Sequence, residues 1–115
     1  MKPLHIGAMD RRITLQMDGV ETGRDAMNAP IYGMTEMTVW ASKEDVSDVE
    51  RVRAQQVGAE ITTRFRVRWS GAVSRFDATG RVLFDGREYA VSGVKEIGRR
   101  EGLEITAAAR SERVL

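Results

Sequence analysis

The segment 59–69 constrains the fold more than any other part of the chain. It reads Ala-Glu-Ile-Thr-Thr-Arg-Phe-Arg-Val-Arg-Trp, with its large apolar residues on one parity and its arginines on the other. Successive side chains of a strand point to opposite faces, so this alternation predicts one long strand with a core face and a cationic face. The core face holds Ile61, Thr63, Phe65, Val67 and Trp69, and the other face holds Thr62, Arg64, Arg66 and Arg68.

Other segments alternate in the same way. We expect strands at 12–17, 36–42 and 103–109, and a turn at 98–102. The clearest local signal is Asp85-Gly86 between two apolar segments, which predicts a two-residue hairpin turn within 81–91 because both central positions need positive φ. This turn sets Phe84 across from Arg87 and Val82 across from Tyr89, and Gly93 is expected to form a bulge in the returning strand.

The period changes between residues 44 and 57. Val46, Val49 and Val52 recur at a spacing of three, and Ser47 and Glu50 have the spacing of a capping box. We therefore predict one short helix over 44–57, ended by Gly58.

Residues 18–35 contain several turn-forming residues and are predicted to form a long loop. Loops of this length are uncommon in a compact domain and are often functional. The segment is also apolar for a free loop, so it either packs back onto its own domain or is buried against another subunit. Its large apolar residues are Met27, Ile31, Tyr32 and Met34.

These elements predict a mainly β fold. The economical arrangement is a small antiparallel β-barrel or sandwich of five to seven strands with one inserted helix, because such a sheet must cover its apolar face and protect its edges. With 115 residues and 42% hydrophobic content, the chain is expected to be a single domain over 1–115. The segments 1–10 and 111–115 are expected to be flexible ends.

Composition excludes several classes of protein. The 18 basic and 17 acidic residues leave a net charge of +1, which argues against a strongly basic nucleic-acid binder. The absence of cysteine excludes disulfides and thiolate metal sites. No segment approaches the roughly twenty apolar residues of a membrane span, so we expect no membrane association.

The residues carry no catalytic pattern. The single histidine, His5, lies in a polar amino-terminal segment, and neither a nucleophile elbow nor a glycine-rich phosphate loop is present. The acidic residues Glu44, Asp45, Asp48 and Glu50 favour the start of a helix more than a metal site. We therefore predict a protein that is not an enzyme and has no cofactor or metal.

The strongest polar feature is the row Arg64, Arg66 and Arg68. It faces either an acidic neighbour or a phosphate backbone. The aromatic residues of the same strand lie on the opposite face, which disfavours single-stranded nucleic acid and favours a protein interface. Trp40 is either a second interface residue or a core tryptophan.

Several motifs occur in an order that resembles the bacteriophage head-to-tail joining family, whose members are also called head closure, stopper or adaptor proteins of long-tailed phages. The resemblance spans residues 9 to about 110. It is carried by Met9-Asp-Arg-Arg-Ile-Thr-Leu-Gln16, Val39-Trp-Ala41, the 61–69 strand, the 81–89 hairpin, Val91-Ser-Gly-Val94 and Arg99-Arg-Glu-Gly-Leu-Glu-Ile105.

The resemblance implies a structural virion protein that forms a ring, usually of twelve copies. The ring would lie between the portal-adaptor assembly and the tail-completion or tail-tube protein, close the DNA channel and offer a docking surface to the tail. It implies assembly in the bacterial host cytoplasm and passage of DNA without sequence-specific binding. The matching position for a channel-facing loop is 44–58, and 18–35 is a competing candidate. In the first segment the acidic residues would repel DNA, which suits a channel wall better than a binding site; they are Glu44, Asp45, Asp48 and Glu50. A small nucleic-acid-binding barrel and a tail-completion protein with a similar barrel are the alternative functions.

Overall fold

The computed structural model describes residues 6–109. His5 and the segments 1–5 and 110–115 lie outside the described residues. Residues 6–10, also expected to be part of a flexible end, contain a short 3-10 turn followed by the buried Met9. In chain order the elements are η1 (Ile6–Ala8), β1 (Arg11–Arg24), β2 (Pro30–Asp45), α1 (Asp48–Gln56), β3 (Thr63–Arg68), η2 (Val73–Arg75), β4 (Arg81–Phe84), β5 (Arg87–Ile97) and β6 (Gly102–Ala109).

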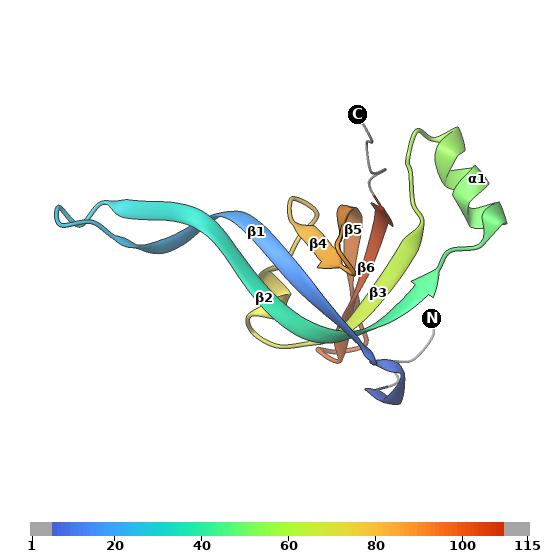
Figure 1. Ribbon diagram of the computed structural model, residues 1–115, viewed down its shortest axis with the longest axis horizontal. Coiled ribbons are helices and arrows are strands. Elements are labelled where there is room, and N and C mark those ends of the chain that lie inside the picture. The colour runs from blue at the N-terminus through green and yellow to red at the C-terminus, as the bar shows by residue number, and fades with distance from the viewer. Residues whose placement is uncertain (1–5, 110–115) are drawn as a thin grey trace.

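The strands close into an antiparallel barrel in the order β1-β2-β3-β6-β5-β4 (Figure 1). The last edge is sealed where β4 returns to β1, pairing Leu83 with Thr14 and Arg81 with Gln16. Closure leaves no free sheet edge around the barrel, so no edge strand there is open to pairing with another chain. The predicted mainly β fold is confirmed, as a barrel rather than a sandwich. Within the described residues, no helix is long and apolar enough to cross a membrane.

The barrel interior is filled by one parity of each strand, as the alternation predicts. At its centre Phe65 is fully buried and meets Tyr89 and Phe84 edge to face, with ring centroids 5.1 and 6.0 Å apart. The 70–79 connection closes the core with two further buried side chains. The core cluster is Ile13, Leu15, Met17, Ala41, Phe65, Val67, Val73, Phe76, Val82, Tyr89, Leu103, Ile105 and Ala107.

The predicted hairpin and bulge in the second half of the chain are confirmed. The β4–β5 hairpin turns at Asp85 and Gly86, which have φ of 53° and 74°. It pairs Phe84 with Arg87 as expected. The register of β5 on β6 shifts at Gly93, so the predicted bulge is present. The long strand is shorter than predicted, however, because only Thr63–Arg68 is paired as β3.

The predicted loop at 18–35 is wrong. β1 and β2 continue past the barrel as a two-stranded ribbon that projects from it, which we call the arm (residues 18–34; Figure 1). Backbone pairing continues from the barrel, where Met17 pairs with Thr35, to the tip, where Arg24 pairs with Pro30. Two register shifts interrupt it, between Met17 and Val20 and between Glu21 and Gly23.

Both faces of the arm are exposed to solvent, and this explains why the sequence pattern did not predict its strands. A strand shows alternating hydrophobicity only where one face is buried, and the arm projects away from the core. Each bulge also changes the parity of the side chains that follow it. The residue Gly19, counted as a loop signal, has φ of 72° within the first irregularity.

Helix α1 exists but is shorter than the predicted range 44–57. Ser47 is its N-cap, and the Ser47 side chain accepts a hydrogen bond from the Glu50 amide, as the capping-box spacing predicts. Glu44 lies at the end of β2 instead of in the helix. The predicted apolar stripe is wrong: Val46 is buried before the helix begins, whereas Val49 and Val52 are exposed and no residue of α1 is buried.

Candidate functional site

The tip of the arm is an ordered turn. Asp25 Oδ1 accepts hydrogen bonds from the amides of Met27 and Ala29, both at 2.9 Å. The Asp25 amide donates to the carbonyl of Ala29, and the Asn28 amide donates to the carbonyl of Asp25. Asn28 takes a left-handed conformation with φ of 63°, which asparagine tolerates better than most residues. The turn therefore holds Met27 at the tip in a defined position, with 90% of its surface exposed.

The other apolar residues of the arm are exposed as well. Ile31, Tyr32 and Met34 lie on β2 beyond the barrel and do not belong to the core. Of the two explanations for this apolar segment, packing back onto its own domain is therefore wrong. Burial of Met27, Ile31, Tyr32 and Met34 against another subunit remains a prediction.

The base of the arm is tied to the barrel by Arg81 of β4. Its guanidinium donates to both carboxylate oxygens of Asp18, at 2.8 and 3.0 Å, and its Nε donates to Gln16 Oε1 at 3.0 Å. Gln16 in turn donates to Glu36 on β2. A bidentate arginine–carboxylate pair fixes orientation as well as position. The hydrogen bonds from Arg81 also lower the pKa of Asp18 from its ordinary value of 3.8.

We predict that Asp18→Asn loosens the base of the arm. The depressed pKa means that the pair stabilises the folded state above pH 3.8 and that this contribution is lost as pH falls through the lowered value. Amide hydrogen exchange of the arm should be faster in the variant at neutral pH, and the difference from wild type should vanish in acid. Asp10→Asn, in an exposed pair with Arg11 outside the arm, is the control. If the amides of the arm exchange equally slowly in wild type and Asp18→Asn at neutral pH, the Asp18–Arg81 pair does not hold the base of the arm.

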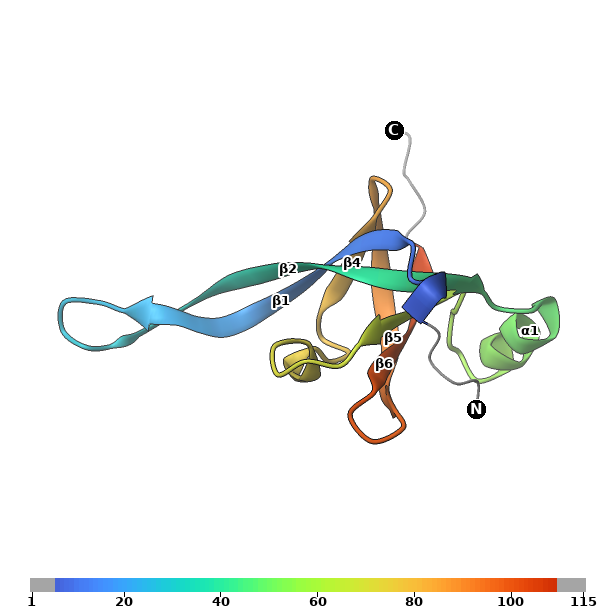
Figure 2. The same ribbon diagram turned by 90° about the horizontal axis from the view of Figure 1, so that it is seen from below.

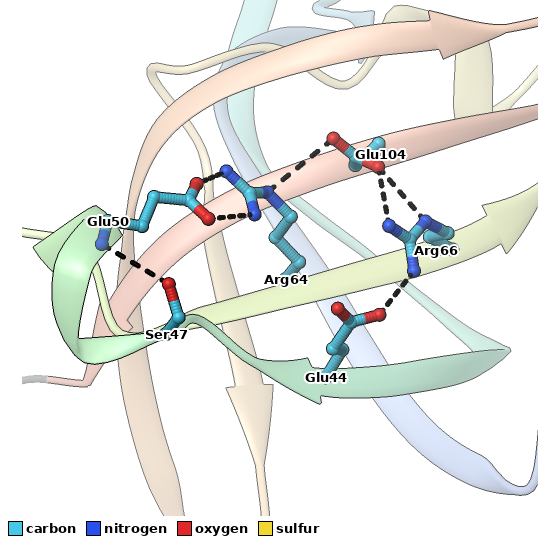
Figure 3. Close-up of polar contacts among 6 residues, drawn as sticks. All are labelled: Glu44, Ser47, Glu50, Arg64, Arg66 and Glu104. Atoms are coloured by element: carbon cyan, nitrogen blue, oxygen red, sulfur yellow. Dashed lines mark hydrogen bonds and ion pairs between the residues drawn. The ribbon is translucent and has the colours of Figure 1, made fainter. Parts of the chain in front are cut away.

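Two residues of the predicted arginine row, Arg64 and Arg66, lie in a network of carboxylates from their own chain (Figure 3). Arg64 forms a two-bonded ion pair with Glu50 of α1, and its Nε lies 3.6 Å from Glu104 of β6. Arg66 donates from Nε to Glu104 at 3.0 Å and from Nη1 to Glu44 of β2 at 3.0 Å, and its Nη2 forms an ion pair with Glu104 at 2.9 Å. Glu104 therefore bridges both arginines.

These contacts change how the row can be interpreted. The acidic neighbour that the sequence pattern requires is present within the chain for Arg64 and Arg66, while Arg68 is exposed at the end of β3. The Arg66 side chain is only 12% exposed. Burial acts to lower its pKa, but the bonds from Glu44 and Glu104 outweigh that effect and raise it. A role of this row in binding a partner remains a prediction.

The four predicted channel-facing acids are not brought together as one free acidic surface. Glu44 and Glu50 pair with arginines, Asp45 pairs with Lys43 at 3.0 Å, and Asp48 is exposed in the first turn of α1. Neutralised carboxylates repel a phosphate backbone weakly. The channel-facing assignment of this segment stays a prediction that the observed ion pairs do not strengthen.

The network also holds α1 against the barrel. No residue of α1 is buried, and the ion pair between Glu50 and Arg64 links the helix to the sheet. Glu104 lies directly across from Arg66 in the β3–β6 pairing and holds both arginines in place.

Removing the carboxylate of Glu104, which bridges the two arginines, should lower the stability of the fold. We expect Glu104→Gln to destabilise the fold by about 1–3 kcal/mol, because two little-exposed guanidiniums lose their shared partner. Chemical denaturation measures the effect, and a double-mutant cycle with Arg66→Met should show coupling between the two positions. Glu96→Gln, exposed on β5, should stay within about 0.5 kcal/mol of wild type. A Glu104→Gln variant as stable as this control would show that the network contributes no stability.

Trp40 lies outside the core. Its side chain is 52% exposed on the outer barrel wall, and the Arg12 guanidinium stacks over its ring at 4.8 Å. The core interpretation of Trp40 is therefore wrong, and its role at an interface remains a prediction. In the part of the chain that the structure describes, no group of three or more histidine or carboxylate side chains is placed to hold a metal ion.

Sequence reasoning missed Glu104, Asp18 and Arg81. Glu104 lies within the predicted strand 103–109, and the pair Asp18–Arg81 joins residues far apart in the chain. The only available signal was charge complementarity between strands, which identifies partners only when strand order and register are known.

The chain was compared with known proteins. The model of a family described as phage head completion protein matches residues 4–110. The solution structure of protein SF1141 from Shigella flexneri 2a is similar, with a TM-score of 0.65 and 25% sequence identity over 96% of this chain and 100% of that one. None of the curated proteins matches the sequence.

Proposed function

The chain belongs to the phage head completion protein family, and from this premise we propose that it forms a ring between the portal-adaptor assembly of the filled capsid and the tail. Membership makes it a structural protein of the phage head–tail region. The proposal adds the ring of about twelve copies suggested by the resemblance, closure of the DNA channel and a docking surface for the tail protein. The ring would assemble in the host cytoplasm and remain in the virion at the head–tail interface.

The arm is the observation that carries this proposal. It extends a molecule of 54 × 41 × 26 Å well beyond its barrel (Figures 1 and 2). It also exposes apolar side chains that do not belong to the core. An ordered, protruding apolar element is typical of a surface that becomes buried when subunits assemble. A ring of such subunits would form through contacts between different patches of neighbouring copies.

The nucleic-acid alternative receives less support. Two of the three arginines in the predicted cationic row are engaged with carboxylates of the same chain. With a net charge of +1, the chain as a whole attracts a phosphate backbone only weakly. A weak, steeply salt-dependent affinity for DNA would therefore be non-specific.

Disruption of the gene in the phage that encodes the chain tests the proposal. Infected or induced cells should accumulate DNA-packaged heads and free tails that do not join, and the wild-type gene supplied from a plasmid should restore joined particles. Electron microscopy of heads purified from the complemented strain should show an added ring at the portal vertex. Normal yields of tailed particles without the gene would refute the proposal.

A further inference from the structure

The exposed apolar residues of the molecule gather in two places. Among the described residues, every large hydrophobic side chain that is exposed lies on the arm or in the α1 segment, apart from Trp40. The arm is at one end of the long axis and α1 at the other, as both views show (Figures 1 and 2). The arm patch is Met27, Ile31, Tyr32 and Met34, and the α1 patch is Val49, Val52 and Val57.

The α1 patch borders a shallow hollow. One face of the helix, formed by Asp48, Val49, Val52, Arg53 and Gln56, lines an open depression of about 400 Å³. Valines are unfavourable in helices compared with leucine or alanine, and here both remain more than half exposed. An exposed apolar stripe on a short helix therefore indicates a contact made by another molecule.

We infer that the arm tip of one copy docks on the α1 face of the next copy. This inference rests on the proposed ring and names the contact that would build it. The two patches differ in shape, one a protruding turn and the other a shallow hollow, and they lie at opposite ends. Unlike patches at opposite ends produce a head-to-tail contact, which closes into a ring when successive rotations add up to a full turn.

The occupant of the α1 face is a second copy because one molecule cannot bring its own two patches together. The arm is a paired ribbon held at its base by Arg81, and α1 is held on the far side by Arg64. The ordered turn presents Met27 before contact, which lowers the entropic cost of binding. Methionine is flexible enough to fit an irregular hollow.

The charges of the two patches complement one another. The distal arm, residues 21–34, carries Glu21, Asp25 and Arg24, for a net charge of −1. The helix carries Asp48, Arg51 and Arg53 in addition to Glu50, which Arg64 neutralises, and this leaves a net charge of +1. The hollow itself is neutral, since Asp48 and Arg53 both line it, but the helix as a whole is basic, and this charge favours the approach of the acidic distal arm.

Cysteine pairing tests this contact in a chain that has no cysteine of its own. The single variants Met27→Cys and Val52→Cys are purified separately, mixed and oxidised with diamide at high protein concentration. The same pairing is carried out in heads purified from cells that express both variants. Both positions are exposed, so folding is not at risk. The matched control is Met27→Cys mixed with Ala72→Cys, because Ala72 is exposed but belongs to neither patch.

The expected result is several-fold more covalent heterodimer from Met27→Cys with Val52→Cys than from the control mixture, with mass spectrometry locating the disulfide between the two substituted positions. Equal yields from both mixtures, in solution and in heads, would overturn the inference. So would Met27→Cys pairing mainly with itself, which indicates a symmetric contact. A ring visible on heads without this crosslink would refute the arm–helix contact alone, whereas joined particles without the gene product would refute the proposed function.

Discussion

Excision of the arm should abolish the joining of heads to tails while the barrel stays folded. The variant replaces residues 18–34 with Asn-Gly, so that a two-residue turn joins Met17 to Thr35. These two residues are already paired across β1 and β2, and Asn-Gly favours the type I′ turn that such a connection needs. The core loses nothing, because no residue of the core cluster lies within 18–34. What is removed is the exposed apolar ribbon proposed to contact the neighbouring subunit.

Two measurements separate assembly from folding in this variant. Circular dichroism and thermal unfolding should show a cooperative β fold, and complementation of the disrupted phage gene should yield no more infectious particles than an empty plasmid. Asp85→Asn, in the exposed β4–β5 turn, changes a second hairpin tip and should complement fully. Full complementation by the arm-less protein would remove the main support for the proposed function.

Phe65→Ala should be the most destabilising single substitution in the barrel. Phe65 is fully buried and packs against Phe84 and Tyr89, so truncation leaves a cavity where three strands face one another. Comparable truncations cost about 3–5 kcal/mol, a large share of the roughly 5–15 kcal/mol that stabilises a typical domain. Urea denaturation followed by tryptophan fluorescence measures the loss.

The size of the substitution provides the control for this prediction. Phe65→Leu keeps most of the buried volume and should cost clearly less than the alanine variant. Val52→Ala, on the exposed face of α1, should leave the stability nearly unchanged. An alanine variant at position 65 that unfolds at the same urea concentration as wild type would show that the barrel core is not packed around this ring.

The parts of the fold that were predicted correctly depend on residues that are close together in the sequence. Phe65 and Val67 are inward because their parity alternates with arginine over one strand. The Asp85-Gly86 turn follows from two adjacent residues that accept positive φ. Ser47 caps α1 because its hydroxyl reaches an amide three residues later.

The candidate site was predicted less completely. The residues Met27, Ile31, Tyr32 and Met34 were identified as too apolar for a free loop, but the segment was assigned as a loop because a ribbon with two solvated faces has no buried parity. The arginines were identified without their partners. Arg66 and Glu104 are 38 residues apart in the chain and meet only because β3 pairs with β6 in one register.

The amino-acid order alone thus determined which side of each barrel strand is apolar, where the tight turns fall and where the helix starts, since each depends on a few adjacent residues. Only the tertiary structure decided that the sheet closes, that β1 and β2 continue as a projecting arm and that Arg64 and Arg66 are paired with Glu44, Glu50 and Glu104. Strand order and register are set by the burial of the whole core at once, and side chains from distant segments become neighbours only after that choice is made.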